Sequence, residues 1–367
     1  MRSYKPSWEK FSMFRSKIAC RATLTLLAAL AAGTASAQTP LPNVDSSEFA
    51  TTPLVLPNGL RGELVKFESA NPADYGPLMK GETGKPVTLT AQLFLPANVK
   101  GPVPAVIETP GSGNLGPHHI AHAAALTSAG LGVLVVDPFF GRGIKDTIAN
   151  QGQLTFAASA YDVLAAAKYL RARKDIDPAR VGATGGSRGG TAVMMAAAAP
   201  VSDAVLGKGK GLRAVVAGYP WCGVQFRSSR LADGASLLIM SGDRDNWVSF
   251  QQCQDAAHAM DVAKQDVVME LFPGALHAFD RAGVPRTEIP AAVTSTIYPT
   301  IYMDDQGTFY NMRTGKADPT VTAEALTAYS IKGGFLHKGV TIGSEGDQAA
   351  EYAKGMTDFL KAKLSQP

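Results

Sequence analysis

Ser187 lies in a sequence pattern that favours a catalytic nucleophile. The segment Gly185-Gly186-Ser187-Arg188-Gly189 has the form G-x-S-x-G. An apolar stretch at 181–184 precedes it and an Ala/Met-rich stretch at 191–199 follows it, which indicates a strand, a sharp turn and a helix. Such a turn exposes the serine hydroxyl, and only small neighbours fit its crowded backbone. The segment fits neither G-K-[ST] nor G-x-G-x-x-G, so a phosphate loop is the weaker alternative. We expect Ser187 to attack an acyl carbonyl.

A serine nucleophile needs a base, and His277 is the best placed of the six histidines. It follows the last predicted strand, at 267–272, so its loop should lie at the same sheet edge as Ser187. His258 is expected in the middle of a helix, and His337 lies in an irregular region. The sequence therefore predicts His277 as the general base.

Three other histidines, His118, His119 and His122, have the helical spacing of metal ligands. No carboxylate or cysteine lies near them in the sequence to complete a metal site. We expect these side chains to cap a helix or to face the substrate, and we predict no metal and no organic cofactor.

The third member of a triad must fix the imidazole tautomer and stabilise its charge. The predicted strand 236–240 leads into Ser241-Gly242-Asp243-Arg244-Asp245. Asp245 is the preferred partner of His277, and Asp243, two residues earlier in the same loop, stays the alternative. The resulting chain order is serine, aspartate, histidine.

Acyl transfer also needs donors for the developing oxyanion. One is expected to be the backbone N–H of Arg188, directly after the nucleophile. The second should come from the loop after the predicted strand 103–107, which reads Thr109-Pro110-Gly111-Ser112-Gly113. Ser112 is the preferred donor and Gly113 the alternative.

The elements that must position these residues alternate between strand and helix patterns. Strands are expected at 87–94, 103–107, 131–136, 181–184, 212–217, 236–240 and 267–272, and helices at 119–129, 156–170, 191–199, 249–259 and 348–364. This alternation predicts an α/β fold, with a mostly parallel sheet and helices on both of its faces. Residues 283–346 are rich in Thr, Tyr, Gly and Pro and interrupt the rhythm. We interpret them as an insertion that either covers the mouth of the active site or has no role there.

The N-terminus resembles a signal peptide. A basic segment ends at Arg21, an apolar run follows at 22–32, and Ala35-Ser36-Ala37 has the A-x-A form of a cleavage site. We expect residues 1–37 to be removed, whether translation starts at Met1 or Met13. The apolar run is too short to span a bilayer, so residues 38–367 should form one exported domain without a membrane span. A short buried helix is the alternative.

Charge and cysteine content fit this interpretation. Residues 1–37 hold six bases and one acid, so they account for the formal charge of +4 and leave a nearly neutral remainder. A neutral chain without a basic patch argues against nucleic acid as a partner. Cys222 and Cys253 remain after residue 37, and in an oxidising compartment they form either one bridge or two buried thiols.

Several segments together resemble the dienelactone hydrolase family of the α/β-hydrolases. They are Pro104-Ala105-Val106-Ile107, Asp137-Pro138-Phe139-Phe140-Gly141-Arg142-Gly143, Asp177-Pro178-Ala179-Arg180-Val181-Gly182, Gly242-Asp243-Arg244-Asp245-Asn246-Trp247-Val248 and Phe272-Pro273-Gly274-Ala275-Leu276-His277-Ala278-Phe279-Asp280. The resemblance implies an α/β-hydrolase fold and assigns the triad acid to Asp245. It also suggests Glu108, Arg142 and Trp247 as residues of the substrate pocket, with Glu108 either pairing with Arg142 or being only a charge at a strand end. Exported relatives resemble the chain around Cys222 and Cys253, which favours a disulfide between them.

The chain departs from the family pattern at three places. Ser187 replaces the cysteine of the founding members, Pro110-Gly111 replaces His-Gly, and the insertion at 283–346 is atypical. A serine nucleophile favours a broader esterase over activity on dienelactone itself.

The sequence as a whole predicts an exported serine hydrolase that cleaves a small-molecule carboxylic ester or lactone. The alternatives are an acyl-peptidase or other acyl hydrolase of the same fold, or a binding protein without catalytic activity. A complete triad in the expected order argues against the binding protein.

Overall fold

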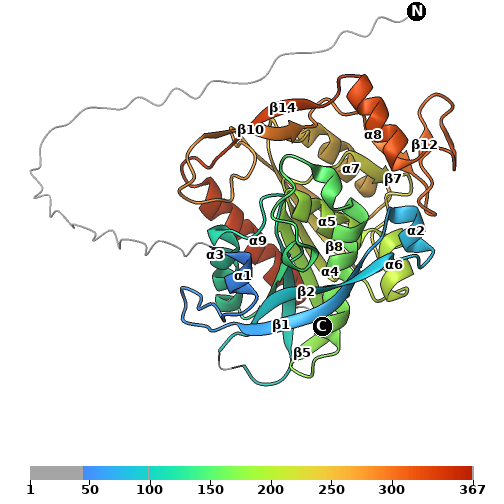
Figure 1. The fold of residues 1–367 in the computed structure, drawn as a ribbon. Helices are drawn as coiled ribbons and strands as arrows, with labels where there is room; N and C mark the ends of the chain where they lie inside the picture. The colour runs from blue at the N-terminus through green and yellow to red at the C-terminus, as the bar shows by residue number, and fades with distance from the viewer. Residues whose placement is uncertain (1–43, 98, 366–367) are drawn as a thin grey trace, which may run out of the picture. The chain divides into compact units, whose positions relative to one another are not determined.

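An eight-stranded sheet lies at the centre of the computed structural model, which describes residues 44–97 and 99–365 (Figure 1). Its strands, in spatial order, are β1 (Glu63–Asn71), β2 (Lys85–Phe94), β4 (Gly132–Asp137), β3 (Val103–Thr109), β5 (Ile176–Gly186), β6 (Ala214–Gly218), β8 (Ser236–Gly242) and β9 (Asp266–Phe272). From β4 to β9 all neighbours are parallel, whereas β2 is antiparallel to both β1 and β4. The predicted mostly parallel sheet is therefore confirmed.

Helices cover both faces of this sheet, and each face has its own hydrophobic core. The helices are α1 (Ser46–Phe49), α2 (Tyr75–Met79), α3 (Pro117–Ser128), α4 (Phe156–Arg171), α5 (Arg188–Ala197), α6 (Ala199–Leu206), α7 (Phe250–Val262), α8 (Ala323–Lys332) and α9 (Gln348–Leu364). Ala105 and Ile107 of β3 point toward α4 and α5, whereas Val106 between them points toward α3 and α9. This alternation along a strand buried on both faces is what an α/β-hydrolase fold requires.

Two differences from the predicted elements have local causes. β1 was not expected, because Glu63, Lys66 and Glu68 interrupt its apolar residues, yet at this sheet edge only alternate positions such as Val65 and Phe67 need to be buried. The helix expected at 191–199 begins earlier, at Arg188, and α6 starts separately at Ala199. The chain is extended at Ala198 between them, and Pro200 occupies the first turn of α6, where proline is well tolerated.

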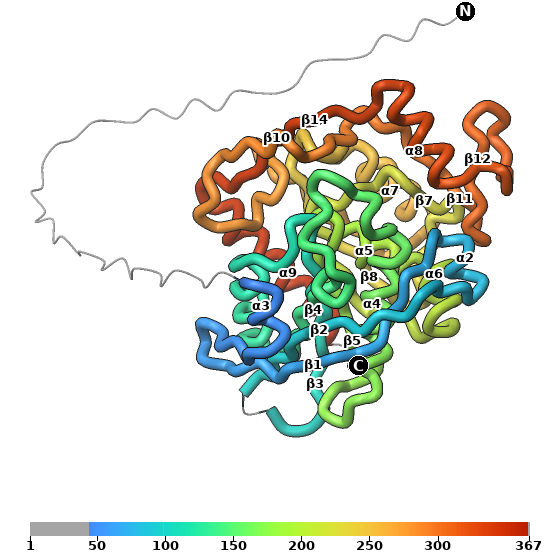
Figure 2. The backbone as a smooth tube through the Cα atoms, viewed as in Figure 1, coloured from blue at the N-terminus to red at the C-terminus, as the bar shows by residue number. Residues whose placement is uncertain are grey.

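The region at 283–346 forms its own small elements between β9 and α9. β10 (Thr287–Thr294) pairs antiparallel with β14 (His337–Ile342), and β11 (Ile301–Met303) pairs in parallel with β7 (Val224–Phe226). β12 (Tyr310–Asn311) and β13 (Lys316–Ala317) form a hairpin, and a turn at 304–307 closes through the Gly307 N–H and the Asp304 carbonyl, 2.9 Å apart. Figure 2 shows these orange and red segments together at one end of the protein. We call residues 283–346 the insertion.

The described residues belong to one compact unit, Leu41–Pro367. None of the helices within residues 44–97 and 99–365 combines the length and the apolar character needed to cross a bilayer. The proposed signal peptide, residues 1–37, lies outside the described residues.

Candidate active site

Ser187 sits at the junction between β5 and α5 in a strained backbone conformation, with φ 57° and ψ −121°. A positive φ is rare for residues other than glycine and marks a tight turn. A Cβ atom on Gly185 would lie 2.7 Å from both the Gly189 carbonyl carbon and the Thr109 oxygen, so glycine is required there. The turn therefore holds the Ser187 side chain at the carboxyl edge of the sheet, as the G-x-S-x-G pattern predicts.

Three side chains from three loops meet at this edge. The Ser187 hydroxyl lies 2.8 Å from His277 Nε2, and His277 Nδ1 lies 2.6 Å from Asp245 Oδ2. The side chains of His277 and Asp245 are each 1% exposed. They meet because β5, β8 and β9 are parallel, so the loops that follow them lie at one edge.

The two aspartates after β8 have different partners. Asp245 Oδ1 accepts hydrogen bonds from the backbone N–H groups of Trp247 and Val248, at 2.8 and 3.0 Å, which leaves Oδ2 to face His277. Asp243 is exposed and accepts from the Gly274 N–H at 2.6 Å, so it ties together the loops after β8 and β9. The structure thus brings Asp245, and not Asp243, to the imidazole.

The loop after β3 lies directly against the nucleophile. A Cβ atom on Gly111 would be 3.1 Å from Ser187 Cβ and 3.0 Å from the Gly186 oxygen. The next residue, Ser112, is 4% exposed and lines the cavity in front of Ser187, whereas Gly113 is exposed and is not among the residues that line it. Ser112 is therefore the better placed of the two predicted donors.

Arg188 contributes to this region through both its backbone and its side chain. As the first residue of α5, its amide has no acceptor within the helix. Its buried guanidinium donates to the carbonyls of Leu154 and Gln151 and to Gln151 Oε1, at 2.7–2.9 Å, and lies 4.3 Å from the centre of the Phe156 ring. Burial lowers the pKa of Arg188 to about 10. Gln151 Oε1 also accepts from the Ser112 hydroxyl at 3.1 Å, so one side chain links the two predicted donor residues.

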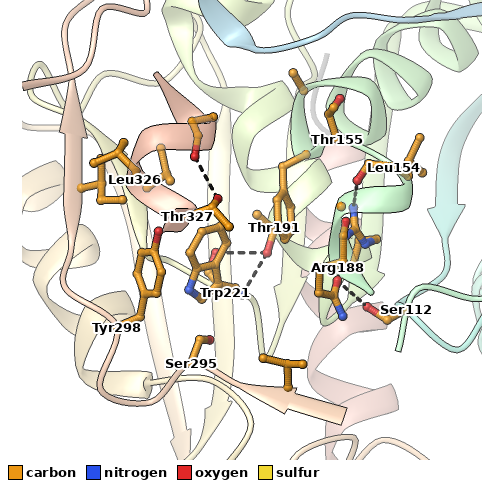
Figure 3. A pocket seen from close by; sticks show the side chains of 18 of the residues that line it. Ser112, Leu154, Thr155, Arg188, Thr191, Trp221, Ser295, Tyr298, Leu326 and Thr327 are labelled. Carbon is orange, nitrogen blue, oxygen red and sulfur yellow. Dashed lines mark hydrogen bonds between the residues drawn. The ribbon is translucent and has the colours of Figure 1, made fainter. Parts of the chain in front are cut away.

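A cavity of about 480 Å³ opens in front of Ser187. Figure 3 shows Ser112, Leu154, Thr155 and Arg188 on one side of it, and Ser295, Tyr298, Leu326 and Thr327 of the insertion on the other. Trp247, suggested as a pocket residue, lines the cavity, and its ring centre lies 4.7 Å from that of His277. Of the two interpretations of the insertion, the structure favours the one in which it covers the active-site mouth.

The sequence model of the Dienelactone hydrolase family matches residues 89–296. The chain belongs to the dienelactone hydrolase family. Among solved structures, it is similar to a dienelactone hydrolase-like promiscuous phosphotriesterase from metagenomic libraries, with 18% identity, coverage of 60% of this chain and 85% of that chain, and a TM-score of 0.44. It is also similar to a thermophilic esterase from the Planctomycetes species Thermogutta terrifontis, with 19% identity, coverage of 53% and 80%, and a TM-score of 0.43. Comparison with curated proteins gives no match.

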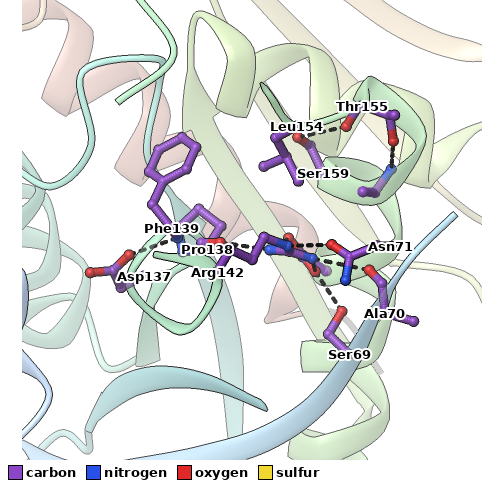
Figure 4. Close-up of polar contacts among 12 residues, drawn as sticks. Ser69, Ala70, Asn71, Asp137, Pro138, Phe139, Arg142, Leu154, Thr155 and Ser159 are labelled. Carbon is purple, nitrogen blue, oxygen red and sulfur yellow. Dashed lines mark hydrogen bonds and ion pairs between the residues drawn. The ribbon is translucent and has the colours of Figure 1, made fainter. Parts of the chain in front are cut away.

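Two residues that the family resemblance suggested for the pocket lie elsewhere. Neither Glu108 nor Arg142 is among the described residues that line the cavity, and the two do not pair with each other. Arg142 forms a two-pronged ion pair with Asp162 of α4 at 2.8 Å. It also donates to Asn71 Oδ1 at 2.7 Å (Figure 4), and because Asn71 belongs to β1, Arg142 joins β1 to α4. A buried carboxylate on α4 holds this arginine away from the cavity, because an unpaired buried charge is costly.

Glu108 instead belongs to a buried polar cluster that the sequence analysis did not identify. Its Oε1 lies 2.9 Å from His122 Nδ1, and His122 Nε2 lies 3.9 Å from Asp280 Oδ2. Burial opposes a charge on His122, but the Glu108 carboxylate outweighs it and raises the pKa of His122. The two carboxylates come from β3 and from the loop after β9. Both are distant from His122 in the chain, so the residues around His122 in the sequence do not reveal the cluster.

Tyr219 connects this cluster to His277. Its hydroxyl donates to Asp280 Oδ1 at 2.6 Å, and its ring meets the His277 ring edge-on with centres 4.8 Å apart. A Cβ atom on Gly186 would overlap the Tyr219 hydroxyl, so Tyr219 also packs directly against the turn at Ser187.

The remaining predicted histidine roles are structural. His119 Nδ1 accepts from the Gly116 N–H at 2.9 Å, at the start of α3, which is the capping role expected for this group. Among residues 44–97 and 99–365, His118, His119 and His122 do not gather with other ligands in a metal-binding arrangement.

The insertion is bonded to the loop that carries Asp245. Thr294 at the end of β10 donates to the Asn246 carbonyl at 2.7 Å, and the Ser295 N–H donates to the Trp247 carbonyl at 2.8 Å. The Asn246 side chain bridges to β14, because its Oδ1 accepts from the Thr341 N–H at 2.9 Å and its Nδ2 donates to Thr341 Oγ1 at 3.3 Å.

The same pair of strands also contacts the loop of the base. Gly343, directly after β14, donates its N–H to the His277 carbonyl at 3.2 Å, and Ile342 forms a parallel bridge with His277. The β10–β14 pair therefore holds together the two loops that carry Asp245 and His277.

A disulfide joins Cys222 and Cys253, as the family resemblance favoured. Both residues are fully buried, with Cα atoms 5.1 Å apart. Cys222 follows β6, next to the cavity-lining Trp221, and Cys253 lies in the first turn of α7, so the bridge links these two segments.

Proposed function

We propose that the chain is a serine hydrolase that cleaves a carboxylic ester or lactone through an acyl-enzyme. The observation that carries this proposal is the hydrogen-bonded series of Ser187, His277 and Asp245 at the mouth of a cavity. Membership of the dienelactone hydrolase family supports ester hydrolysis as the reaction class.

In the proposed reaction, Ser187 Oγ attacks the carbonyl carbon while His277 Nε2, 2.8 Å away, accepts its proton. Asp245 keeps the other proton on Nδ1 and stabilises the imidazolium. His277 then donates its proton to the leaving alkoxide, and a water molecule releases the acid by the same steps in reverse.

The oxyanion of each tetrahedral intermediate is assigned to the backbone N–H groups of Arg188 and Ser112. Arg188 stands at the N-terminus of α5, where the helix dipole also favours negative charge. The shared bond to Gln151 holds the two loops at a constant separation. Side chains and backbone amides of this chain thus supply the nucleophile, the base and the oxyanion donors, and water is the second substrate.

Replacement of the nucleophile tests this function. Ser187→Ala should lower kcat by about six orders of magnitude, as removal of a triad serine does in a well-studied protease. The wild type should be labelled by a fluorophosphonate probe and the variant should not. Ser112→Ala is the control, because it keeps the backbone amide and should still be labelled. A Ser187→Ala variant that keeps a tenth of the wild-type activity would exclude Ser187 as the nucleophile.

We also propose that the protein is exported after removal of residues 1–37. The basic segment, the apolar run and the Ala35-Ser36-Ala37 site support this proposal, and so does the Cys222–Cys253 disulfide, since disulfides persist mainly in oxidising compartments. Mass spectrometry of the protein from fractionated cells should find Gln38 at the N-terminus. An intact N-terminus in the cytosolic fraction would contradict export.

A further inference from the structure

Three aromatic rings form a continuous surface across the cavity. The ring of Phe156 on α4 lies 4.9 Å from that of Trp221, and Trp221 lies 5.6 Å from Tyr298 of the insertion, centre to centre. All three residues line the cavity that contains Ser187. We call Phe156, Trp221 and Tyr298 the aromatic face.

The aromatic face is held in a constant position relative to the nucleophile. Thr191, four residues after Ser187 on α5, accepts from the Trp221 N–H at 2.9 Å and donates to the Trp221 carbonyl at 3.0 Å. Phe156 is fixed in turn by the Arg188 guanidinium over its ring. A group that binds to these rings is therefore positioned relative to the Ser187 hydroxyl.

The insertion extends this surface with aliphatic side chains. Ile301, Phe309 and Leu326 line the cavity and are at most 8% exposed, whereas Ile331 also lines it and is 64% exposed. The apolar lining thus continues from the interior to the rim. A cavity of about 480 Å³ lies within the range of roughly 300–1,000 Å³ that accommodates drug-sized ligands.

We propose that the natural substrate is an ester or lactone that carries a ring-sized apolar group, which binds to the aromatic face. This inference rests on the proposed function and names the substrate class of the same site. Aromatic rings prefer offset or edge-on neighbours, and such contacts contribute beyond the area they bury. A short alkyl ester would leave both the aromatic face and the aliphatic rim uncovered.

Two matched pairs of esters test the proposal with the wild-type protein. Methyl 3-phenylpropanoate is compared with methyl butanoate for the acyl side, and benzyl acetate with propyl acetate for the alcohol side. A saturated spacer separates each ring from the reacting carbonyl. We expect kcat/KM to be at least about tenfold higher for the ring ester in one pair, given the apolar area of a phenyl ring. A ratio of one or less in both pairs would overturn the proposal.

A pair of tyrosine variants tests the site. Tyr298→Leu should lower the ratio of ring ester to alkyl ester by about two- to tenfold, which corresponds to the usual contribution of an aromatic contact. Tyr302→Leu is the control, because Tyr302 is a half-buried tyrosine of the same insertion that is not among the cavity-lining residues. An unchanged ratio in Tyr298→Leu, or an equal fall of the ratio in both variants, would show that the ring of the substrate does not bind to Tyr298.

The fluorophosphonate probe separates this proposal from the proposed function. Both tyrosine variants should still be labelled at Ser187, and Tyr302→Leu as fast as the wild type, because neither change touches the triad. A wild-type protein that is not labelled and cleaves none of the four esters would refute serine hydrolysis itself. Labelling together with equal rates on ring and alkyl esters would refute only the substrate class.

Discussion

The aspartates at positions 243 and 245 offer a matched test of the triad, since both can be changed to asparagine. In Asp245→Asn, the side-chain oxygen should keep the position of Oδ1, because two backbone N–H groups donate to it. The amide nitrogen then takes the place of Oδ2, 2.6 Å from His277 Nδ1. Two donors cannot face each other, so Nδ1 must become an acceptor and the imidazole proton moves to Nε2.

This tautomer cannot accept the proton of Ser187. The same substitution in the serine protease template lowers kcat by about 10⁴, with the geometry intact. At about 1.36 kcal/mol per factor of ten, the expected loss is about 5.5 kcal/mol of transition-state stabilisation. Asp243→Asn retains an oxygen acceptor for the Gly274 N–H at an exposed site, so its effect should stay within about 0.5 kcal/mol, or roughly twofold.

The assay is steady-state hydrolysis of a 4-nitrophenyl ester, with circular dichroism and thermal unfolding of both variants to show that the fold is intact. The expected result is a large fall in kcat for Asp245→Asn alone. Equal losses in the two variants, or a larger loss in Asp243→Asn, would refute the assignment of the triad acid and the tautomer argument with it.

Three further predictions concern the surroundings of the triad. Reduction of the Cys222–Cys253 bridge opens a loop of sequence separation 31 and should lower the free energy of unfolding by about 3–4 kcal/mol on the chain-entropy estimate; an unchanged melting temperature in reductant would contradict this. Asn246→Ala removes both side-chain bonds to β14 and should cost about 1 kcal/mol of stability per bond, with a fall in kcat that exceeds any change in KM; unaltered kinetics would show that the strand pair only shapes the cavity. Burial opposes a charge on His122, but Glu108 outweighs this effect and raises the pKa of His122 above 6.5 in the folded protein. Protonated His122 should therefore contribute fully to the stability of the fold below about pH 6.5, and this contribution should be lost as the pH rises through the folded-state pKa. The difference in unfolding free energy between the wild type and His122→Gln should therefore shrink from pH 6 to pH 9. A difference that grows over this range would show that folding lowers the pKa of His122 instead of raising it.

The positions of the three proposed triad residues along the chain were predictable because each belongs to a local pattern. A nucleophile turn needs glycines within two residues of Ser187, and a strand followed by a polar loop marks where Asp245 and His277 leave the sheet. Parallel strands bring such loops to one edge, so chain order and strand pattern sufficed to group the three residues. The disulfide was only one of two open possibilities until the resemblance to exported relatives favoured it.

Contacts between residues distant in the chain required the tertiary structure. The sequence favoured Asp245 and left Asp243 as the alternative, and the structure shows that two backbone N–H groups hold the Asp245 carboxylate so that it faces His277. Glu108 and Arg142 were wrongly placed beside the substrate, because the buried partners that hold them, His122 and Asp162, lie on separate helices.

The sequence by itself determined the α/β class, the family and the place of the G-x-S-x-G turn, because the spacing of hydrophobic residues and the composition of turns are local properties. Only the tertiary structure decided that the insertion lines the cavity, that Tyr298 completes an aromatic face with Phe156 and Trp221, and that Asn246 ties the insertion to the loop of Asp245. These residues are far apart in the chain, and their contacts depend on side-chain packing across elements, which no local pattern encodes.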